Sequence, residues 1–522
     1  MAKEFNTAVT CNPKRHYMVN TTAKMKVFEG LIDQKCYFTI NRARQFGKST
    51  SLNWIYKNLS DRYLVVPISF ETESKVNWEN DKTFCNYFCG KIVNIFTDMP
   101  NSDASCLEYW KNAQSKDIAD FDQLSMIISE FCKTVGRKVV LTIDEVDQAS
   151  NNEVFLRFLG MLRNMYLDRE KFENDAYTFW SVVLAGVYDV KNLKLKIRPD
   201  SEHQFNSPWN VATDYKLDMT FNPQEISTML AEYENDYHIG FDIMQISNEI
   251  YKYTSGYPVL VSRICKEIDE HLDKNWSKDG VMAAVKNIIK DDNFLILKSL
   301  TKNIELYPDL KKILRAITLE NFHINYYTKN LPLELGRMFS LIRPDENSQA
   351  QIHNLIFQQV LYDYFISENQ LSTLSPDMGI RVFINKNGDL NMPLIINRFK
   401  DLMSKKQDKE EFLEREGRFM FICFLKPIIN GTGFYYSEPE NDDGSRMDLV
   451  ITYNHKEYII ELKIWHGTEY EISGRDQLAE YLTTRGLDEG YLVTFSVLKN
   501  KVVQEKPEWI EHNGKRIYEA VI

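Results

Sequence analysis

The stretch that most constrains the fold is "CYFTINRARQFGKSTSLNWIYKNL", residues 36–59. Its first residues favour a β-strand, and the apolar residues after Gly-Lys-Ser recur at helical spacing, at Leu52, Ile55, Tyr56 and Leu59. The pattern predicts a strand, a loop and a helix. Backbone N–H groups in such a loop surround phosphate oxygens, and the start of the helix favours their negative charge. The loop is therefore a candidate phosphate-binding site.

Within this loop, Lys48 is expected to reach the terminal phosphates of a nucleotide and Ser49 to ligate Mg²⁺. The first Gly of the pattern G-x-x-x-x-G-K-[ST] would be residue 42, which is Arg42, so a chance Gly-Lys-Ser is an alternative. The residues predicted to bind the nucleotide are Arg44, Gln45, Phe46, Gly47, Lys48, Ser49 and Thr50.

A second segment, "KVVLTIDEVD" at residues 138–147, predicts a buried strand that ends in Asp144 and Glu145. These are the residues that a Walker B strand needs. Asp144 would hold the Mg²⁺ and its water shell, and Glu145 would polarise the hydrolytic water. Either motif alone could be purely structural, for example an ordinary buried strand that ends in an acidic turn. Together, in this order, they predict binding of ATP and Mg²⁺.

Segments across nearly all of the first 290 residues resemble bacterial AAA-like ATPases whose loop reads R-x-R-x-F-G-K-[ST], where the Arg at position 42 is usual. They include "LAGVYDVKNLKLKIR", "NSPWNVATDY" and "TSGYPVLVSRIC". Gly256-Tyr257-Pro258 is similar to the turn with which related ATPases touch the adenine side, so Pro258 is predicted to contact the nucleotide. Arg198 is a candidate finger or sensor, with a solvated loop as the alternative.

Near the other end of the chain, "YIIELKIW" (458–465) places Glu461 and Lys463 on one face of a predicted strand. The other face is apolar and is predicted to be the core side. The upstream segment "RMDLVITY" (446–453) predicts a partner strand, with Asn454-His455 as a tight turn.

With that two-residue turn, Asp448 lies opposite Glu461, and a turn two residues longer would keep the same face. Adjacent carboxylates are costly unless a cation lies between them. Mg²⁺ is commonly held by one or two carboxylates, and a nearby lysine can orient or deprotonate the attacking water. A lone E-x-K is more often a structural ion pair, but the added aspartate favours a metal site.

The arrangement D-x(12)-E-x-K resembles the core of the PD-(D/E)XK nuclease superfamily, although Met447 stands where that family has a proline. The resemblance implies that Asp448, Glu461 and Lys463 are catalytic and that Asp448 and Glu461 ligate Mg²⁺. It implies another ligand from a helix predicted at 410–429, best matched by Glu414, with Glu416 as the fallback. It also implies a Gln and a Tyr near the site, here Gln477 and Tyr481 on a helix predicted within 474–496.

The order of predicted elements indicates an α/β fold with several domains. Strands near 36–41, 63–70, 138–144, 179–186 and 215–219 alternate with helices, which predicts a mostly parallel P-loop NTPase sheet. We expect an ATPase core (1–220), a helical lid (221–295), a winged-helix-like module (296–367), a linker (368–400) and a restriction-endonuclease-like α/β domain (401–522). The scarcity of Arg and Lys at the wing favours a coupler over DNA binding.

Composition indicates in which cellular compartment the protein is expected. The chain of 522 residues has no apolar run of the roughly 20 residues that a membrane span needs and no signal peptide, which predicts a cytoplasmic protein without membrane contact. Its eight cysteines lack C-x-x-C spacing, which indicates reduced packing residues. The net charge of −11 argues against a protein coated by nucleic acid but permits a local basic groove.

Two functions stay open. The first is an ATP-regulated nuclease that acts on nucleic acid, with DNA favoured, and that uses one Mg²⁺ with ATP and one or two in the nuclease-like domain. Defence against mobile DNA fits this architecture by analogy only. The second is a nucleotide-switched signalling or nucleic-acid-binding protein with a non-cleaving nuclease-like fold. A nuclease assay with Mg²⁺ or Mn²⁺, with and without ATP, separates them. The oligomeric state is open, with a homo-oligomer among the alternatives.

Overall fold

The structure is a computed structural model of the chain. It describes residues 3–8, 10–41, 43, 45–71, 74–99, 104–146, 152–187, 209, 211–213, 217–291, 293–319, 324–327, 329–369, 383–404, 414–429, 433–436, 449–464, 468–495 and 507–522. The chain divides into two compact units, which are described separately. One comprises Met1–Ala284 with Leu335–Ser340, and the other comprises Val285–Glu334 with Leu341–Ile522.

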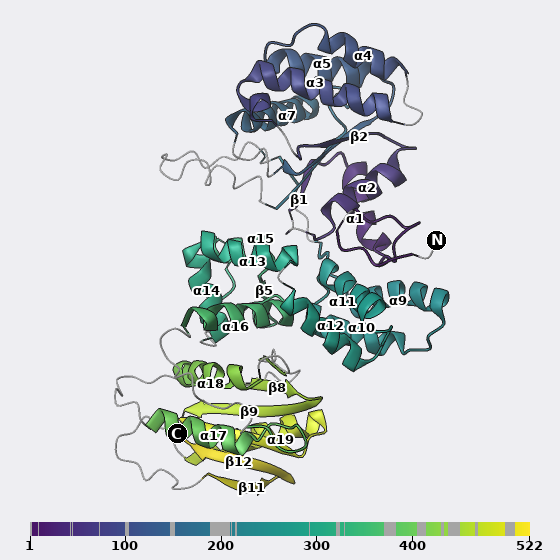
Figure 1. Cartoon of the computed structure of the whole chain (residues 1–522). Coiled ribbons are helices and arrows are strands. Elements are labelled where there is room, and N and C mark those ends of the chain that lie inside the picture. Colours follow the sequence, from purple (N-terminus) through teal and green to yellow (C-terminus); the bar gives the residue numbers. More distant parts are fainter. Residues whose placement is uncertain are drawn as a thin grey trace. The chain divides into compact units, whose positions relative to one another are not determined.

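The first unit contains a four-stranded, fully parallel sheet (Figure 1). Its strands follow the order β1-β4-β3-β2, with bounds β1 (Phe38–Asn41), β2 (Leu64–Ser69), β3 (Val139–Asp144) and β4 (Ser181–Gly186). These strands confirm four of the five expected and the parallel arrangement. The fifth, expected at 215–219, is wrong for residues 217–219, which belong to no strand, while 215 and 216 lie outside the described residues.

Helices cover this sheet because its strands are apolar on both sides. Alternate residues of β3, Val139, Leu141 and Ile143, join a large aromatic-rich cluster, while Val140 and Thr142 are buried on the opposite side. The helices before the lid are α1 (Thr22–Asp33), α2 (Lys48–Leu59), η1 (Lys75–Trp78), α3 (Asp81–Asp98), α4 (Ala104–Gln114), α5 (Phe121–Thr134) and α7 (Glu153–Lys171).

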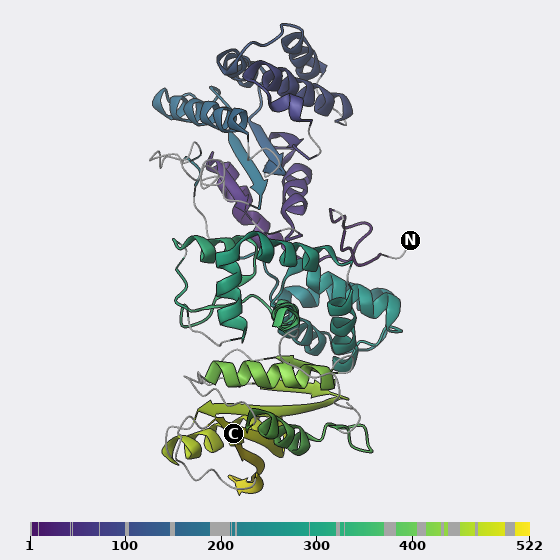
Figure 2. The ribbon, with the colours of Figure 1, turned by 60° about the vertical axis from the view of Figure 1, so that its left-hand side comes forward.

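Helices form over the range 221–295, as expected, and are visible in both views (Figures 1 and 2), while their role as a lid stays a prediction. The first of these helices begins with a capping box, in which the Asn222 side chain accepts from the Glu225 N–H at 2.8 Å and Glu225 accepts from the Asn222 N–H at 2.9 Å. The lid helices are α9 (Pro223–Tyr237), α10 (Ile243–Thr254), α11 (Pro258–His271) and α12 (Lys278–Lys290).

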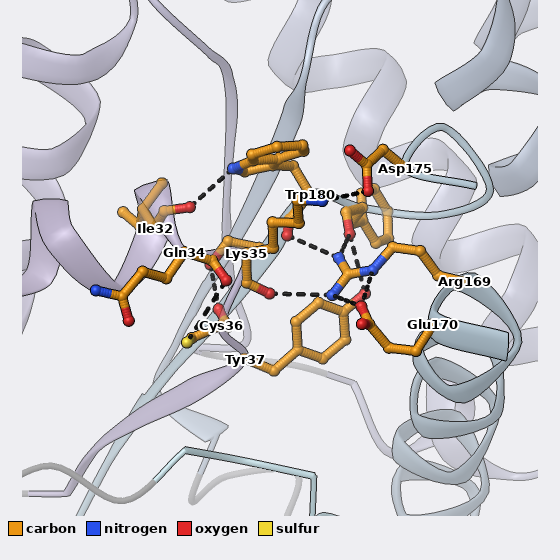
Figure 3. Close-up of polar contacts among 11 residues, drawn as sticks. Ile32, Gln34, Lys35, Cys36, Tyr37, Arg169, Glu170, Asp175 and Trp180 are labelled. Atoms are coloured by element: carbon orange, nitrogen blue, oxygen red, sulfur yellow. Dashed lines mark hydrogen bonds and ion pairs between the residues drawn. The ribbon is translucent and has the colours of Figure 1, made fainter. Parts of the chain in front are cut away.

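Arg169, near the end of α7, ties that helix to the amino-terminal edge of the sheet (Figure 3). Its side chain is 1 % exposed. One terminal nitrogen donates to the carbonyl oxygens of Phe179 and Trp180 at 3.0 and 2.9 Å, and the other donates to that of Lys35 at 3.1 Å. Because Lys35 and Trp180 precede β1 and β4, the guanidinium satisfies main-chain acceptors at the start of both strands.

Replacing Arg169 by methionine is expected to lower the free energy of unfolding by about 3 kcal/mol or more, because three carbonyl oxygens lose their buried charged donor. Arg157→Met on the same helix is the matched control. Arg157 pairs with Asp81 at 2.8 Å but is 54 % exposed, so its loss should cost about 0–1 kcal/mol. Thermal denaturation compares the two variants, and equal shifts in Tm would show that the Arg169 contacts contribute no more than a surface pair.

The second unit begins with the elements expected of the winged-helix-like module. The two short strands are antiparallel and frame the expected turn at 344–347, with Ile342 paired to Ile352. The elements are α13 (Leu295–Leu306), α14 (Pro308–Leu319), α15 (Leu331–Met338), β5 (Ile342–Pro344), β6 (Ala350–Ile352) and α16 (Leu355–Asn369). The residues of α15 from Leu335 onward are assigned to the first unit. The element order agrees with the prediction, and the role as a coupler stays a prediction.

A six-stranded mixed sheet forms the rest of this unit, in the order β11-β12-β10-β9-β8-β7 (Figure 1). Strands β9, β10 and β12 are mutually parallel neighbours, and the outer pairs are antiparallel. The bounds are β7 (Gly433–Tyr436), β8 (Leu449–Tyr453), β9 (Lys456–Ile464), β10 (Glu489–Phe495), β11 (Glu508–His512) and β12 (Lys515–Val521), with helices α17 (Met392–Ser404), α18 (Glu414–Ile429) and α19 (Thr468–Arg485).

Two expectations about this sheet need correction. The apolar side of β9 is not the sole core side, because Ile459 and Glu461 on the other side are also fully buried, beneath α19. The predicted linker 368–400 is wrong for residues 392–400, which belong to α17, a helix that packs against the sheet. Its Phe399 is fully buried and contacts Phe495 of β10. A central strand needs cover on both faces, and α17 supplies part of it.

Candidate functional site

The phosphate loop ends at the amino terminus of α2, as the sequence predicts. Gly47 caps the helix with a φ of 80°, a left-handed conformation that glycine adopts without strain. Lys48 is the first helical residue, is 7 % exposed, and donates from Nζ to the Ala43 carbonyl oxygen at 3.0 Å. Ser49 and Thr50 follow in the first turn and are partly exposed, whereas Arg42 and Arg44 lie outside the described residues. The lysine thus lies folded across the loop that it is predicted to serve.

Asp144 and Glu145 lie at the carboxyl end of β3. Since β1, β4 and β3 are parallel neighbours in that order, the loop after β1 and the end of β3 open at the same edge of the sheet. Glu145 has a φ of 53°, unusual for a residue with a side chain, and its N–H donates to Asp144 Oδ1 at 2.9 Å. Such local strain, typically about 1–3 kcal/mol, is concentrated at functional sites.

The Gly256-Tyr257-Pro258 turn reaches the phosphate loop from the lid. The Tyr257 ring lies edge-on to the Phe46 ring with centroids 4.7 Å apart, and burial raises the pKa of Tyr257. Gly256 has a φ of +71°, and a Cβ there would lie 1.9 Å from the backbone oxygen of Phe221. Pro258 is the first residue of α11. The turn therefore requires glycine and brings Tyr257 next to Phe46 of the loop. The contact of Pro258 with a nucleotide stays a prediction.

Residues 3–8 and 10–20 contact the phosphate loop as well, which the sequence did not predict. The Thr7 carbonyl accepts from Gln45 Nε2 at 3.4 Å, and the Cys11 N–H donates to Thr50 Oγ1 at 3.3 Å. Tyr17 donates to Asp236 Oδ2 of α9 at 2.7 Å. Burial, followed by that hydrogen bond, raises the pKa of Tyr17. The segment thus touches both the loop and the lid. Its only sequence signal is the pair of aromatic residues Phe5 and Tyr17 in a polar stretch.

The hairpin predicted around Asn454-His455 is confirmed over the described residues. Tyr453 pairs with Lys456, and the register continues to Leu449 opposite Ile460. Both turn residues have positive φ, 47° and 64°, as a two-residue turn of this kind requires. Asp448 lies outside the described residues, so its position opposite Glu461 stays a prediction.

Glu461, Lys463 and Gln477 come together on the face that α19 covers. Lys463 Nζ lies 2.7 Å from Glu461 Oε1 and donates to Gln477 Oε1 at 3.1 Å. The Glu461 side chain is 0 % exposed, whereas that of Lys463 is 32 % exposed. A buried carboxylate without a cation would be strongly destabilising, so the lysine compensates it. Three residues predicted from the sequence therefore form one contact group.

Of the remaining residues predicted for the two sites, Tyr481 is described by the structure, whereas the side chains of Glu414 and Arg198 are not. Tyr481 is 1 % exposed and lies in a hydrophobic cluster with Ile459 and Leu478, which indicates a packing role. Glu414 is the first residue of α18, and its side chain lies outside the described ones. Arg198, the candidate finger, also lies outside the described residues.

Metal binding has different support at the two sites. Ser49 and Asp144 carry oxygen atoms of the kind that Mg²⁺ prefers, and Lys48 carries a positive charge that suits phosphate, so these residues fit a nucleotide with Mg²⁺. In the C-terminal sheet, Glu461 is a fitting oxygen ligand, but its partners Asp448 and Glu414 are not described. Within the described ranges, no three His, Cys, Asp or Glu side chains gather as a metal site. None of the helices described is long and apolar enough to cross a membrane.

The chain was compared with protein-family models, curated proteins and solved structures. A family model described as an AAA-like domain matches residues 7–332. Among solved structures, a Walker-type ATPase of Pyrococcus abyssi, PABY2304, is similar with a TM-score of 0.46 and 13% identity over 68% of this chain and 99% of that one. The ORC2 protein of Aeropyrum pernix in ADPNP–ADP complexes gives 0.35 and 13% over 71% and 98%. No curated protein matches the sequence.

Proposed function

Because the chain belongs to the family of AAA-like domain proteins, we propose that its N-terminal half binds ATP with Mg²⁺ and hydrolyses it. The observation that carries this proposal is the shared edge of the parallel sheet, where the Gly47-capped loop with Lys48 opens beside Asp144 and Glu145. Loop N–H groups and Lys48 would bind the phosphates, Ser49 and Asp144 would hold Mg²⁺, and Glu145 would orient the water.

Replacing Glu145 by glutamine is expected to leave ATP binding nearly unchanged while slowing phosphate release by about a hundredfold or more, because the amide cannot polarise water as a carboxylate does. Equilibrium binding of a fluorescent ATP analogue and a phosphate-release assay measure the two effects. The exposed Glu153→Gln at the start of α7 is the control, for which neither quantity should change. Unchanged phosphate release in the Glu145 variant would contradict the role of Glu145.

For the C-terminal domain we propose a Mg²⁺-dependent nuclease, with DNA as the favoured substrate. The Glu461–Lys463–Gln477 contact group supports it, together with a hairpin register that would pair Asp448 with Glu461 one step beyond Leu449. Bound Mg²⁺ would supply Lewis acidity and charge neutralisation at the phosphodiester. Asp448 and Glu461 would ligate it, with Glu414 from α18 as a further candidate. Lys463 would hold the attacking water and stabilise the developing negative charge, and Gln477 would orient Lys463.

One observation favours the second function, a nucleotide-switched binding protein. The Glu461 carboxylate is fully buried and already paired with Lys463, an arrangement that a purely structural ion pair would also adopt. Incubation of the full chain with plasmid and single-stranded DNA, with Mg²⁺ or Mn²⁺, separates the two. Cleavage that requires metal supports the nuclease, whereas retained DNA binding without cleavage supports the switch.

A further inference from the structure

A second charged pair lies in line with Glu461. In the parallel register, Glu461 of β9 pairs with Leu492 of β10, which in turn pairs with Glu519 of β12. Paired residues of neighbouring strands point to the same face, so the two glutamates are roughly 10 Å apart, two strand spacings, on the face under α19. Both carboxylate side chains are 0 % exposed. The sheet thus buries two carboxylates on one face, two strands apart, beneath the same helix.

Each buried carboxylate has its own cation. Glu461 has Lys463, and Glu519 has Arg475, whose Nη2 lies 2.6 Å from Oε2 and whose Nε donates to Oε1 at 3.2 Å. This two-point contact fixes the orientation of the planar guanidinium as well as its position. Arg475 is 25 % exposed. The pair therefore constrains the part of α19 that carries it.

Three consecutive residues of α19 contact three different parts of the sheet. Arg475 reaches β12, and Asp476 bonds to His512 and Asn513 at the β11–β12 turn at 2.7 and 3.0 Å. The hydrogen bond with His512 lowers the pKa of Asp476. Gln477 accepts from Lys463 of β9. Because consecutive helical residues are separated by about 100°, a small rotation of the helix would disturb all three contacts together.

The helix also approaches the sheet closely at this point. A Cβ at Gly474 would lie 3.4 Å from Leu492 Cδ1 and 3.7 Å from Lys463 Cγ. Glycine thus brings the helix backbone against the stem of Lys463. The four-carbon stem of a lysine is flexible, so the position of its amine depends on the groups that hold it. The groups that hold it include Glu461 on the same strand and Gln477 on the helix.

We propose that Arg475 and Glu519 are positioning residues for the Lys463 amine and act through Gln477. The relevance to cleavage rests on the nuclease function proposed above. The ion pair fixes the rotation of α19, the rotation sets the Gln477 amide, and the amide holds the Lys463 amine beside Glu461. If the Arg475–Glu519 pair only stabilised the domain, a folded variant without the pair would hold the Lys463 amine as firmly as the parent does.

The test measures how readily the Lys463 amine reacts in the folded full chain. Acylation by an N-hydroxysuccinimide acetate is followed by peptide mass spectrometry in the parent, Arg475→Gln and Glu519→Gln. The expected result is an increase of about tenfold at Lys463 in both variants, roughly the effect of losing one hydrogen bond to a charged group. Arg475→Lys keeps the charge but not the two-point contact, so it should restore only part of the protection. An unchanged rate in Arg475→Gln or Glu519→Gln overturns the proposal.

A matched control lies on the same helix. Arg485 pairs with Glu457 of β9 at 3.0 Å and is 20 % exposed, but it lies at the far end of α19. Arg485→Gln should leave the reactivity of Lys463 unchanged. Lys515, which donates to the Leu487 carbonyl oxygen at 2.7 Å, serves as an internal reference for unfolding. An equal increase in Arg485→Gln, or a parallel increase at Lys515, means loss of general stability and also overturns the proposal.

Cleavage gives a second readout. If the parent cleaves DNA, Arg475→Gln should lower kcat by about tenfold with KM for DNA unchanged, because the amine is misplaced while the binding surface remains. A raised KM with unchanged kcat would instead make Arg475 a DNA-binding residue and overturn the positioning role. If the parent does not cleave, the nuclease proposal fails, while the acylation result still decides whether Arg475 positions Lys463.

Discussion

Replacement of Lys48 by alanine is expected to weaken ATP binding by about a hundredfold. The ammonium group is the point charge that a phosphate loop directs at the terminal phosphates, and charge-assisted contacts of this kind are worth about 1.5–3 kcal/mol. In the structure this amine donates to the Ala43 carbonyl oxygen of the same loop at 3.0 Å. Isothermal titration with ATP and Mg²⁺ measures the loss.

Lys57→Ala is the matched control for this experiment. Lys57 lies in the last turn of the same helix, α2, and is exposed, so its removal should leave ATP affinity unchanged. Thermal denaturation without nucleotide shows whether Lys48→Ala remains folded. ATP binding by the Lys48 variant with the affinity of the parent would show that the Gly-Lys-Ser loop is not the nucleotide site.

Replacement of Lys463 by alanine is expected to reduce DNA cleavage by about a thousandfold, since a group that holds the attacking water and stabilises transition-state charge contributes on that order. The same change leaves the Glu461 carboxylate buried without its cation, so it should also lower stability. Lys463→Arg keeps a cation beside Glu461 and separates the two effects. It should retain most of the stability while cleavage remains strongly reduced, because a guanidinium stays protonated and fits the site differently.

The control for the Lys463 variants is Lys456→Ala. Lys456 lies on the same strand, β9, is 59 % exposed, and pairs with Asp389. The loss of Lys456 should change neither the cleavage rate nor the rise in Tm that added Mg²⁺ causes. Cleavage is measured on plasmid and single-stranded DNA, and stabilisation by the shift of Tm with added Mg²⁺. If Lys463→Ala cleaves as the parent does, Glu461 and Lys463 are a structural ion pair.

Local patterns were sufficient for much of both sites. The Gly-Lys-Ser loop, the strand that ends in Asp144 and the two-residue hairpin turn each depend on residues close in the sequence, and each lies where the pattern predicts. Glu461, Lys463 and Gln477 could be grouped because alternation along a strand and the turn of a helix fix which residues share a face.

The predicted linker was wrong at residues 392–400 because helix-start signals were mistaken for loop signals. Asn391 caps α17, with its side chain accepting from the Leu394 N–H at 3.2 Å, and Pro393 lies in the first turn, where proline is well tolerated. The buried Ile395, Ile396 and Phe399 that follow are the stronger signal. The strand expected at 215–219 was wrong at residues 217–219 for another reason. Within the described residues, the first sheet contains no further strand with which this segment pairs.

Contacts between residues distant in the sequence could not be predicted. Arg475 and Glu519 are 44 positions apart, and nothing in either segment specifies that β12 lies next to β10. Likewise, the contacts of residues 3–20 with α9 depend on how the lid packs against the core of the first unit. Pairings of this kind follow from the topology of the sheet and the packing of the lid, which single-sequence periodicity does not specify.

The proposed link between nucleotide binding and cleavage is tested most directly by single-turnover cleavage of DNA by the full chain with Mg²⁺. The rate is measured without nucleotide, with ADP and with ATP. We propose that the nucleotide bound in the N-terminal half gates cleavage, and the cleavage rate should then depend on that nucleotide by about tenfold or more, as expected for a coupling free energy of about 1–3 kcal/mol. The same proposal predicts that Lys48→Ala loses this dependence and that Glu145→Gln keeps the ATP-bound rate. Equal cleavage in all three nucleotide states would contradict the proposed gating, and absence of cleavage in every state would contradict the nuclease itself.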